Sequence, residues 1–266
     1  MKDLIVRALL IEPLNDVRFI DYDIKQSHPN EEIVTWETTS VCNSERRRYA
    51  LTKSHKDRKS FIGGHEAVGF IETDQYIKRR YALLPHSNCI TRGDTIVCEY
   101  CRSNQENLCK NMSHAGLDKN TPSGFCEKNV VQRSQLFDVT ELNSKLSPFL
   151  EPLSCVIRSW SLAKIDFKMS SSINIIGGGP IGCLHAFYLN KANRNNNIFI
   201  IESSRERRLA LEIVFNEFEN IKIVDDEYKN KSLISVMAAS SSSSYKKAKL
   251  LTKKDGTLIL FSGFDQ

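Results

Sequence analysis

The sequence predicts an α/β protein in two parts: a β-rich, barrel-like part and a part in which strands alternate with helices. Short strand-like runs separated by turn residues fill roughly the first 150 residues, a pattern typical of a β domain. From Ser154 onward, strand-like and helix-like runs alternate, which predicts a parallel sheet with crossover helices. We therefore expect one domain over residues 1–153 and a second over residues 154–266.

The strands of the first part are predicted from runs of aliphatic, aromatic and β-branched residues. Turn-forming segments such as "PLND" and "SHPNE" lie between these runs, and no long helical periodicity interrupts them. The expected strands cover residues 3–11, 17–22, 31–42, 66–73 and 79–85.

The second part begins with an amphipathic helix over residues 154–165, followed by a buried strand over 172–178 and a helix over 180–193. Further strands are expected at 198–203, 233–239 and 257–263, and a further helix at 245–254. Between "IKIVDD" and "LISVM" only "EYKNKS" remains. A parallel connection usually needs about a dozen residues or more, so a crossover helix is expected to be missing there.

Composition favours an ordinary globular protein of the cytoplasm. The 266 residues are 41% hydrophobic and 26% charged, enough for a real core and about two domains. The start of the chain has no signal-peptide pattern, and no apolar run approaches the ~18 residues of a membrane span. The net charge of +5 is spread along the chain, which argues against nucleic acid as a partner.

A glycine-rich stretch, "INIIGGGPIG", predicts a dinucleotide-binding turn. Gly177, Gly179 and Gly182 stand in G-x-G-x-x-G register after a strand and at the start of a helix, the context that the motif requires. The next strand ends in Glu202, which can accept hydrogen bonds from ribose hydroxyls and would repel a 2′-phosphate, favouring NAD. Arg205 and Arg207 oppose that preference. The alternative is a glycine-rich turn without a ligand.

Two sets of residues could hold metal ions. His65 and Glu66 are adjacent in "GGHEAVG", Cys42 ends an earlier strand with Ser44 two positions on, and Glu151 lies in the apolar "FLEPLS". A thiolate, an imidazole and a carboxylate suit zinc with one position open for substrate. Separately, Cys98, Cys101 and Cys109 are spaced C-x2-C-x7-C.

Three interpretations of the cysteine stretch are open. Disulfides are disfavoured in a reducing compartment, whereas close C-x2-C spacing is natural for zinc. A nucleic-acid-binding knuckle could recruit His114 as a fourth ligand, but such a knuckle would need basic and aromatic neighbours of its own.

Taken together, these motifs resemble the zinc-dependent medium-chain dehydrogenase/reductases, and within them the sorbitol and threonine dehydrogenase branch. The resemblance rests on "SVCNSE", "GGHEAVG", the cysteine stretch, "SGFCEKNVV", "LEPLS", "IIGGGPIG" and "DGTLILFSG", in the family's order. It implies a GroES-like β-barrel domain over residues 1–153, with a cysteine lobe at 85–112. A Rossmann NAD-binding domain would follow over residues 154–266.

The resemblance also implies roles for individual residues. Cys42, His65, Glu66 and Glu151 would surround a catalytic zinc, with the two glutamates competing for the third ligand position, and Ser44 would relay a proton. "PHSNC" matches the family's first lobe cysteine at Cys89, so a structural zinc would be held by Cys89, Cys98, Cys101 and Cys109. The rival alignment puts Thr95 first and leaves three cysteines. The coenzyme loop comprises Gly177, Gly179, Pro180, Ile181, Gly182 and Glu202.

The expected activity is hydride transfer between NAD and a secondary alcohol, polyol or sugar-like substrate. The sequence ends just past the strand "TLILFSG", so we expect a Rossmann domain that is incomplete at its C-terminus. The alternative function is therefore a catalytically silent homologue that keeps zinc and NAD binding or serves in assembly. The expected partners are the small-molecule substrate and, as one further possibility, a second copy of the chain, with no membrane.

Overall fold

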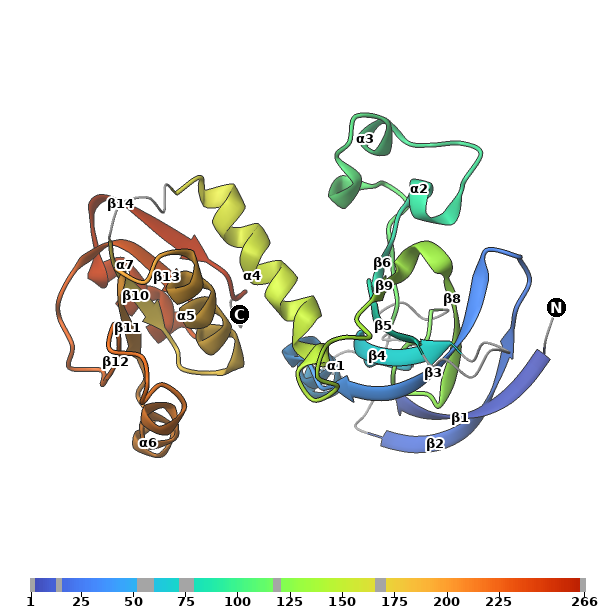
Figure 1. Ribbon diagram of the computed structural model, residues 1–266, viewed down its shortest axis with the longest axis horizontal. Coiled ribbons are helices and arrows are strands. Elements are labelled where there is room, and N and C mark those ends of the chain that lie inside the picture. The colour runs from blue at the N-terminus through green and yellow to red at the C-terminus, as the bar shows by residue number, and fades with distance from the viewer. Residues whose placement is uncertain are drawn as a thin grey trace. The chain divides into compact units, whose positions relative to one another are not determined.

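The computed structural model describes residues 3–12, 16–51, 60–71, 79–116, 121–165 and 171–263. The chain forms two compact units, residues 1–151 and residues 152–266, and each is described by itself. Unit 1 is built from antiparallel strands and unit 2 from parallel strands with helices (Figure 1). No helix within the described ranges is both long enough and apolar enough to cross a lipid bilayer.

The core of unit 1 is a five-stranded antiparallel sheet in the order β8-β3-β4-β5-β9. Its central strand β4 is apolar on both faces, and Val34, Ala67 and Val131 pack together in the core. A hairpin of β1 and β2 joins the sheet through backbone hydrogen bonds, including Leu9 N–H to the Phe125 carbonyl. The strands are β1 (Asp3–Glu12), β2 (Asp16–Lys25), β3 (Glu31–Ser40), β4 (Glu66–Ile71), β5 (Arg79–Leu83), β8 (Lys128–Gln132) and β9 (Leu136–Asp138).

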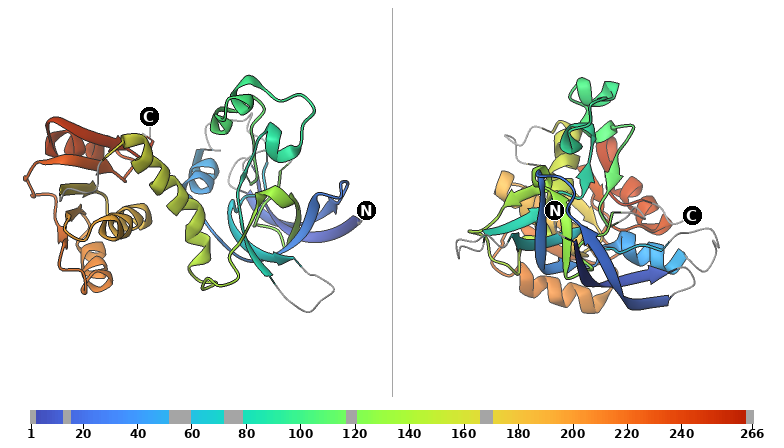
Figure 2. Two further views of the ribbon diagram at one scale, coloured as in Figure 1. Left: turned by 45° about the horizontal axis from the view of Figure 1, so that its top comes forward. Right: turned by 90° about the vertical axis from the view of Figure 1, so that its right-hand side faces the viewer.

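A cysteine lobe leaves this sheet through a short ribbon of two strands, β6 (His86–Ser87) and β7 (Ser113–His114). The lobe stands away from the sheet in each view (Figure 1, Figure 2). It carries α2 (Cys89–Arg92), α3 (Glu99–Arg102) and the 3-10 turn η1 (Glu106–Leu108). Elsewhere in unit 1 lie α1 (Asn43–Leu51) and the 3-10 turns η2 (Arg133–Gln135) and η3 (Ser147–Phe149).

Unit 2 holds a five-stranded parallel sheet in the order β12-β11-β10-β13-β14. Its strands are β10 (Ser172–Ile176), β11 (Asn197–Ile201), β12 (Ile221–Val224), β13 (Ser232–Met237) and β14 (Thr252–Leu260). Its helices are α5 (Pro180–Ala192), α6 (Arg205–Val214) and α7 (Ser242–Leu251), and α4 (Leu150–Ala163) enters the unit from residue 152 on.

Both faces of the parallel sheet are covered, which explains why its strands are nearly continuous apolar runs. Ile173 and Ile175 pack with Leu189 of α5 in the main core, whereas Ile176 lies in a second cluster with Met237 and with Ala248 of α7. Because successive strand side chains point to opposite faces, the two clusters mark the two faces.

Strands β12 and β13 are joined by residues 225–231 without a helix, which confirms that the expected crossover helix is missing. The strands remain in one parallel sheet although the connection between them has no helix. Tyr228 stacks on Phe199 of β11 with ring centroids 5.1 Å apart, and the Asn174 side chain donates to the Asn230 carbonyl over 3.0 Å.

The fold class predicted from the sequence is confirmed: a β-rich part with a curled antiparallel sheet precedes a parallel sheet with helices. Each strand and helix expected in the two parts has a counterpart at closely similar residues. The first helix of the second part begins earlier than expected, at Leu150 and not at Ser154, so that Glu151 lies in its first turn.

Candidate functional site

The first candidate site forms where β3 ends and α1 begins. The Cys42 N–H donates to Glu45 Oε2 over 3.0 Å, so that a glutamate in the third helical position reaches back to the residue that caps the helix. This is one half of a capping box. The other oxygen, Glu45 Oε1, accepts from His65 Nδ1 at 2.6 Å and from the Gly64 N–H at 3.1 Å. One buried carboxylate therefore ties Cys42 to His65.

His65 is held in a single orientation by this carboxylate. Burial alone would lower the pKa of His65, but its contacts with Cys42 and Glu45 raise that pKa to about 10. Because Nδ1 is hydrogen-bonded to Glu45, Nε2 is the ring nitrogen that could bind a metal ion. Gly64 makes the turn before it: its φ of +90° and a backbone nitrogen 2.6 Å from a hypothetical Cβ leave room only for glycine.

Two more carboxylates lie beside His65. Ligand atoms of His65, Glu66 and Glu151 all lie within 4.8 Å of one another, as do those of Cys42, Glu45 and His65. Glu66 also accepts a hydrogen bond from the Ser40 hydroxyl. His65 thus belongs to two groups of potential ligands, one with Cys42 and Glu45 and the other with Glu66 and Glu151.

The donor atoms around His65 fit zinc. A thiol, an imidazole nitrogen and carboxylate oxygens are the donors that zinc takes in sites that keep a position open. Glu45 supplies the carboxylate that commonly orients a metal-bound histidine. It was not among the residues predicted from the sequence, and in the structure it is almost fully buried.

The second candidate metal centre is the cysteine lobe. The sulfur atoms of Cys89, Cys98, Cys101 and Cys109 lie within 4.8 Å of one another. The Cys89–Cys109 and Cys98–Cys109 sulfurs are 3.5 and 3.9 Å apart, close to the ~3.8 Å edge of a tetrahedron with Zn–S bonds of ~2.3 Å. Each of the eight cysteines lies in the described ranges and is a free thiol.

Backbone N–H groups surround the sulfur of Cys98. Those of Cys101 and Lys110 lower the pKa of this thiol to about 6, whereas burial raises the pKa of Cys101 to about 12. A metal ion among four such sulfurs would favour the thiolate form of each. The four cysteine sulfurs together fit a structural zinc site, as expected from the alignment that begins with Cys89.

The third candidate site is the glycine-rich turn of unit 2. Gly179 caps α5, which begins at Pro180, and Ile181 and Gly182 follow in its first turn. A Cβ on Gly182 would lie 2.0 Å from the Gly177 carbonyl oxygen, so only glycine permits this close approach of helix and turn. A cavity of about 540 Å³ opens here, lined by Gly177, Gly179 and Glu202 and by serines at the start of α7.

Glu202 directly follows β11 and lines this cavity. Burial would raise the pKa of its carboxyl, but the N–H groups of Ser204 and Gly178 and the Arg207 guanidinium hold that pKa below its ordinary value. The distances are 2.8 Å from Ser204, 2.9 Å from Gly178 and 3.0 Å from Arg207.

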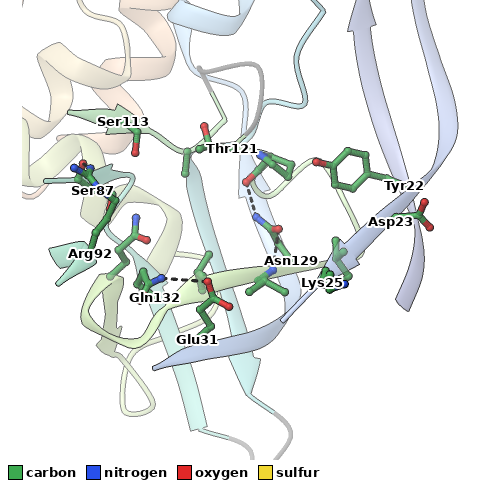
Figure 3. Close-up of a pocket in the computed structure, with 16 residues that line it drawn as sticks. Tyr22, Asp23, Lys25, Glu31, Ser87, Arg92, Ser113, Thr121, Asn129 and Gln132 are labelled. Atoms are coloured by element: carbon green, nitrogen blue, oxygen red, sulfur yellow. Dashed lines mark hydrogen bonds between the residues drawn. The ribbon is translucent and has the colours of Figure 1, made fainter. Parts of the chain in front are cut away.

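A separate polar cavity of about 310 Å³ lies in unit 1 between β2, β8 and the β6–β7 ribbon (Figure 3). Ser87 and Ser113, which are cross-strand partners, lie at one end and Tyr22 at the other (Figure 3). Gln132 donates to Glu31 along its floor over 3.3 Å. None of the predicted ligands lines this cavity, so it is distinct from the two metal centres.

Comparisons with known proteins agree with this architecture. Residues 28–141 match the alcohol dehydrogenase GroES-like domain family. The chain is 30% identical to (R,R)-butanediol dehydrogenase of Saccharomyces cerevisiae over 116 residues, 43% of this chain and 29% of the relative. It is 27% identical to L-idonate 5-dehydrogenase of Vitis vinifera over 187 residues, 66% of this chain and 46% of the relative. The chain spans about half or less of the curated relatives that it matches.

Solved structures share the fold at low identity. A chain described as a zinc-binding dehydrogenase of Sinorhizobium meliloti 1021, solved with NADP, gives a TM-score of 0.81 at 21% identity, covering 99% of this chain and 78% of that one. L-idonate 5-dehydrogenase of Escherichia coli gives 0.77 at 18% identity, with 97% and 76% covered. Acetophenone reductase of Geotrichum candidum, solved with NAD, gives 0.75 at 18%, with 98% and 78% covered.

The fold of both units, the order of the motifs and the matched domain agree with one another. Residues 28–141 belong to the alcohol dehydrogenase GroES-like domain family, and the chain shares its fold with dehydrogenases of known structure.

Proposed function

We propose that the protein is a zinc-dependent oxidoreductase that transfers a hydride between NAD and a secondary alcohol of a polyol or sugar-like substrate. The observation that carries the proposal is that His65 shares one group of potential ligand atoms with Cys42 and a second with Glu66 and Glu151. The glycine-rich cavity of unit 2 supports a dinucleotide as the second reactant. The alcohol loses a proton and a hydride to become a carbonyl compound, and the hydride converts NAD⁺ to NADH.

Zinc bound among these residues would supply Lewis-acid polarisation of the alcohol oxygen, which lowers the pKa of the alcohol. Cys42 and His65 Nε2 would hold the ion, together with a carboxylate of Glu66 or Glu151. Glu45 keeps the imidazole in place through its 2.6 Å contact. The Ser44 hydroxyl lies 3.3 Å from Glu45 Oε2, so a hydroxyl suited to passing on the released proton stands beside the cluster.

The substrate class is supported by the names of the relatives. Butanediol and idonate both carry secondary hydroxyl groups, and the relatives named for them match this chain. NAD is favoured as the coenzyme because Glu202 directly follows β11, at a position where an acidic side chain accepts hydrogen bonds from ribose hydroxyls. The proposal also includes a structural zinc in the cysteine lobe.

The experiment is turnover with a panel of butanediols, hexitols, aldonates and simple alcohols, following the absorbance of NADH. We expect at least one vicinal diol or polyol to be oxidised, with the activity lost in Cys42→Ser. Cys155→Ser is the matched control, because Cys155 is exposed and outside both cysteine-containing clusters. A folded protein that binds zinc and NADH but turns over nothing in the panel would contradict the proposal and support the silent homologue.

A further inference from the structure

The polar cavity of unit 1 lies between parts of the chain that are far apart in the sequence (Figure 3). Strand β2 supplies Tyr22 and strand β8 supplies Gln132, whereas Ser87 and Ser113 come from the β6–β7 ribbon at the base of the cysteine lobe. Its volume of about 310 Å³ is at the lower end of the ~300–1,000 Å³ usual for small-molecule pockets. A ligand here would contact both the ribbon and the strands of unit 1.

The cationic groups that line the cavity are already matched by acids. The Arg92 guanidinium pairs with Asp94 at 2.6 Å and donates to two backbone carbonyls at 2.8 and 2.9 Å. Lys25 is the other cation among the lining residues, and Asp23 of the same strand lines the cavity beside it. An anionic ligand would therefore find no positive charge that lacks a counter-charge.

Glu31 is the acid on the floor of the cavity. Its Oε2 accepts from the backbone N–H groups of Ser27 and His28 at 2.8 and 3.0 Å, and its Oε1 accepts from the Gln132 amide at 3.3 Å. These donors satisfy the carboxylate but do not cancel its charge, which disfavours an anion. A cation would have to compete with three donors that are already in place. The charges thus favour an uncharged ligand.

The polar groups that remain for a ligand are hydroxyls and an amide. The hydroxyls of Ser87, Ser113 and Tyr22 form no hydrogen bond with any protein group in the described ranges. Ser87 is only 7% exposed, so its hydroxyl depends on what fills the cavity. Gln135 is 5% exposed and uses its amide nitrogen on the Leu84 carbonyl over 3.0 Å, so its amide oxygen is a further acceptor.

These hydroxyls lie at the two ends of the cavity, Ser87 and Ser113 at one and Tyr22 at the other (Figure 3). Burial raises the pKa of Tyr22, so its phenol keeps its proton. A hydroxyl both donates and accepts, and its natural partner is a hydroxyl of the ligand. The aliphatic side chains of Ile24 and Val131 also line the cavity. So few polar groups cannot order all the water that fits here, and displacing loosely held water favours binding.

We propose that this cavity binds a small uncharged polyhydroxy compound, a polyol, at a site separate from the His65 centre. The ligand hydroxyls bond to Ser87 and Ser113 at one end and to Tyr22 at the other, and the carbon chain lies against the aliphatic side chains. Because Ser87 and Ser113 belong to the ribbon, the bound polyol ties the base of the cysteine lobe to β2 and β8. This inference does not rest on the proposed function, since it uses neither the His65 centre nor the glycine-rich cavity.

The test is an NMR titration of the whole chain with erythritol, xylitol and mannitol. The amide signals of residues 86–87 and 113–114 report on the ribbon, and those of residues 43–45 report separately on binding beside the His65 centre. We expect saturable shifts in the ribbon, together with slower hydrogen exchange there. Gluconate, which adds a carboxylate to a similar set of hydroxyls, should bind at least about tenfold more weakly because of the Glu31 charge.

Two variants remove one hydroxyl each without adding bulk. Ser87→Ala should weaken polyol binding roughly five- to tenfold, the effect of losing one hydrogen bond. Ser103→Ala is the matched control, an exposed serine of the lobe that does not line the cavity, and it should bind as wild type. Tyr22→Phe acts at the opposite end and should weaken binding similarly, so the test does not depend on an intact lobe in Ser87→Ala.

The proposal is overturned if no polyol shifts the ribbon signals, because the cavity then holds water only. It is also overturned if Ser87→Ala and Ser103→Ala bind equally well, or if gluconate binds as tightly as the polyols. Shifts confined to residues 43–45 would place the polyol at the His65 centre alone. That result would support the proposed function and overturn this inference, so the two can be told apart.

Discussion

The two candidate metal centres of unit 1 are assembled in opposite ways. The cysteine cluster comes from one short stretch, Cys89 to Cys109, whereas the cluster around His65 gathers residues from Cys42 to Glu151. Beyond its own cysteines, the lobe has only Val97 and Met112 as apolar packing among the described residues. The His65 cluster stands on strand β4, which is buried on both faces. The lobe should therefore depend on its metal for order, and the His65 cluster on the sheet.

Removing one cysteine from each centre tests most directly whether the two centres depend on metal to different degrees. We expect Cys101→Ser to lose the lobe zinc and the order of residues 85–112, because a structural zinc contributes ~10–16 kcal/mol of apparent binding free energy to local folding. Cys42→Ser should lose activity with little change in thermal stability. Zinc content per chain and hydrogen exchange of the lobe measure both effects. Equal loss of stability in the two variants would contradict the contrast.

An intermediate loss of metal affinity is expected when Glu45, which caps α1 and hydrogen-bonds His65, is changed. Glu45→Gln removes the charge that orients the imidazole, and such outer-shell changes typically weaken metal binding ~10–100-fold. Chelator competition at the His65 centre measures this loss, while the lobe zinc should be retained. Glu206→Gln is the matched control, an exposed acid in the first turn of α6, and it should leave both metals in place. Unchanged affinity in Glu45→Gln would show that the sheet alone orients His65.

The smallest effect is expected on the zinc affinity of the lobe when the cap of its first helix, Asn88, is removed. The Asn88 amide oxygen accepts from the N–H groups of Ile90 and Thr91 at 2.8 and 2.9 Å, and its nitrogen donates to Glu106. Losing such a cap costs about 1 kcal/mol. Because zinc binding and lobe folding are coupled, Asn88→Ala should weaken lobe zinc about fivefold. Ser241→Ala, which removes a comparable cap on α7, should leave zinc affinity unchanged.

Sequence patterns predicted the strands and helices whose buried side chains leave a regular spacing of apolar residues. The apolar run at β10 and the motif after it indicated a parallel strand, a turn and α5. Helix α1 was not predicted, because "NSERRRYAL" has no apolar stripe. Its start is fixed instead by Glu45 bonding back to Cys42.

The role of Glu45 could not be predicted for a related reason. An acid three residues after a helix start is ordinary capping chemistry, and only the three-dimensional path of the chain brings His65 to its second oxygen. The pairing of Glu202 with Arg207 is similar. The sequence offered two arginines near the acid, and the register of α6 decides which of them faces the cavity.

The connection between β12 and β13, which has no helix, affects both the chain entropy and the packing of unit 2. Doubling the length of a connection raises the entropic cost of closing it by only about 0.6 kcal/mol. The shortness of residues 225–231 therefore adds little to the stability of unit 2. A helix in this place would have buried apolar surface worth ~25 cal/mol per Å², whereas the present segment packs chiefly through the ring of Tyr228 on Phe199. Sparse packing makes a segment open at low free-energy cost. Asp226 of this segment lines the glycine-rich cavity, and its carbonyl accepts a hydrogen bond from Lys247, which lines the same cavity. We therefore expect a ligand in the cavity to stabilise the segment as well.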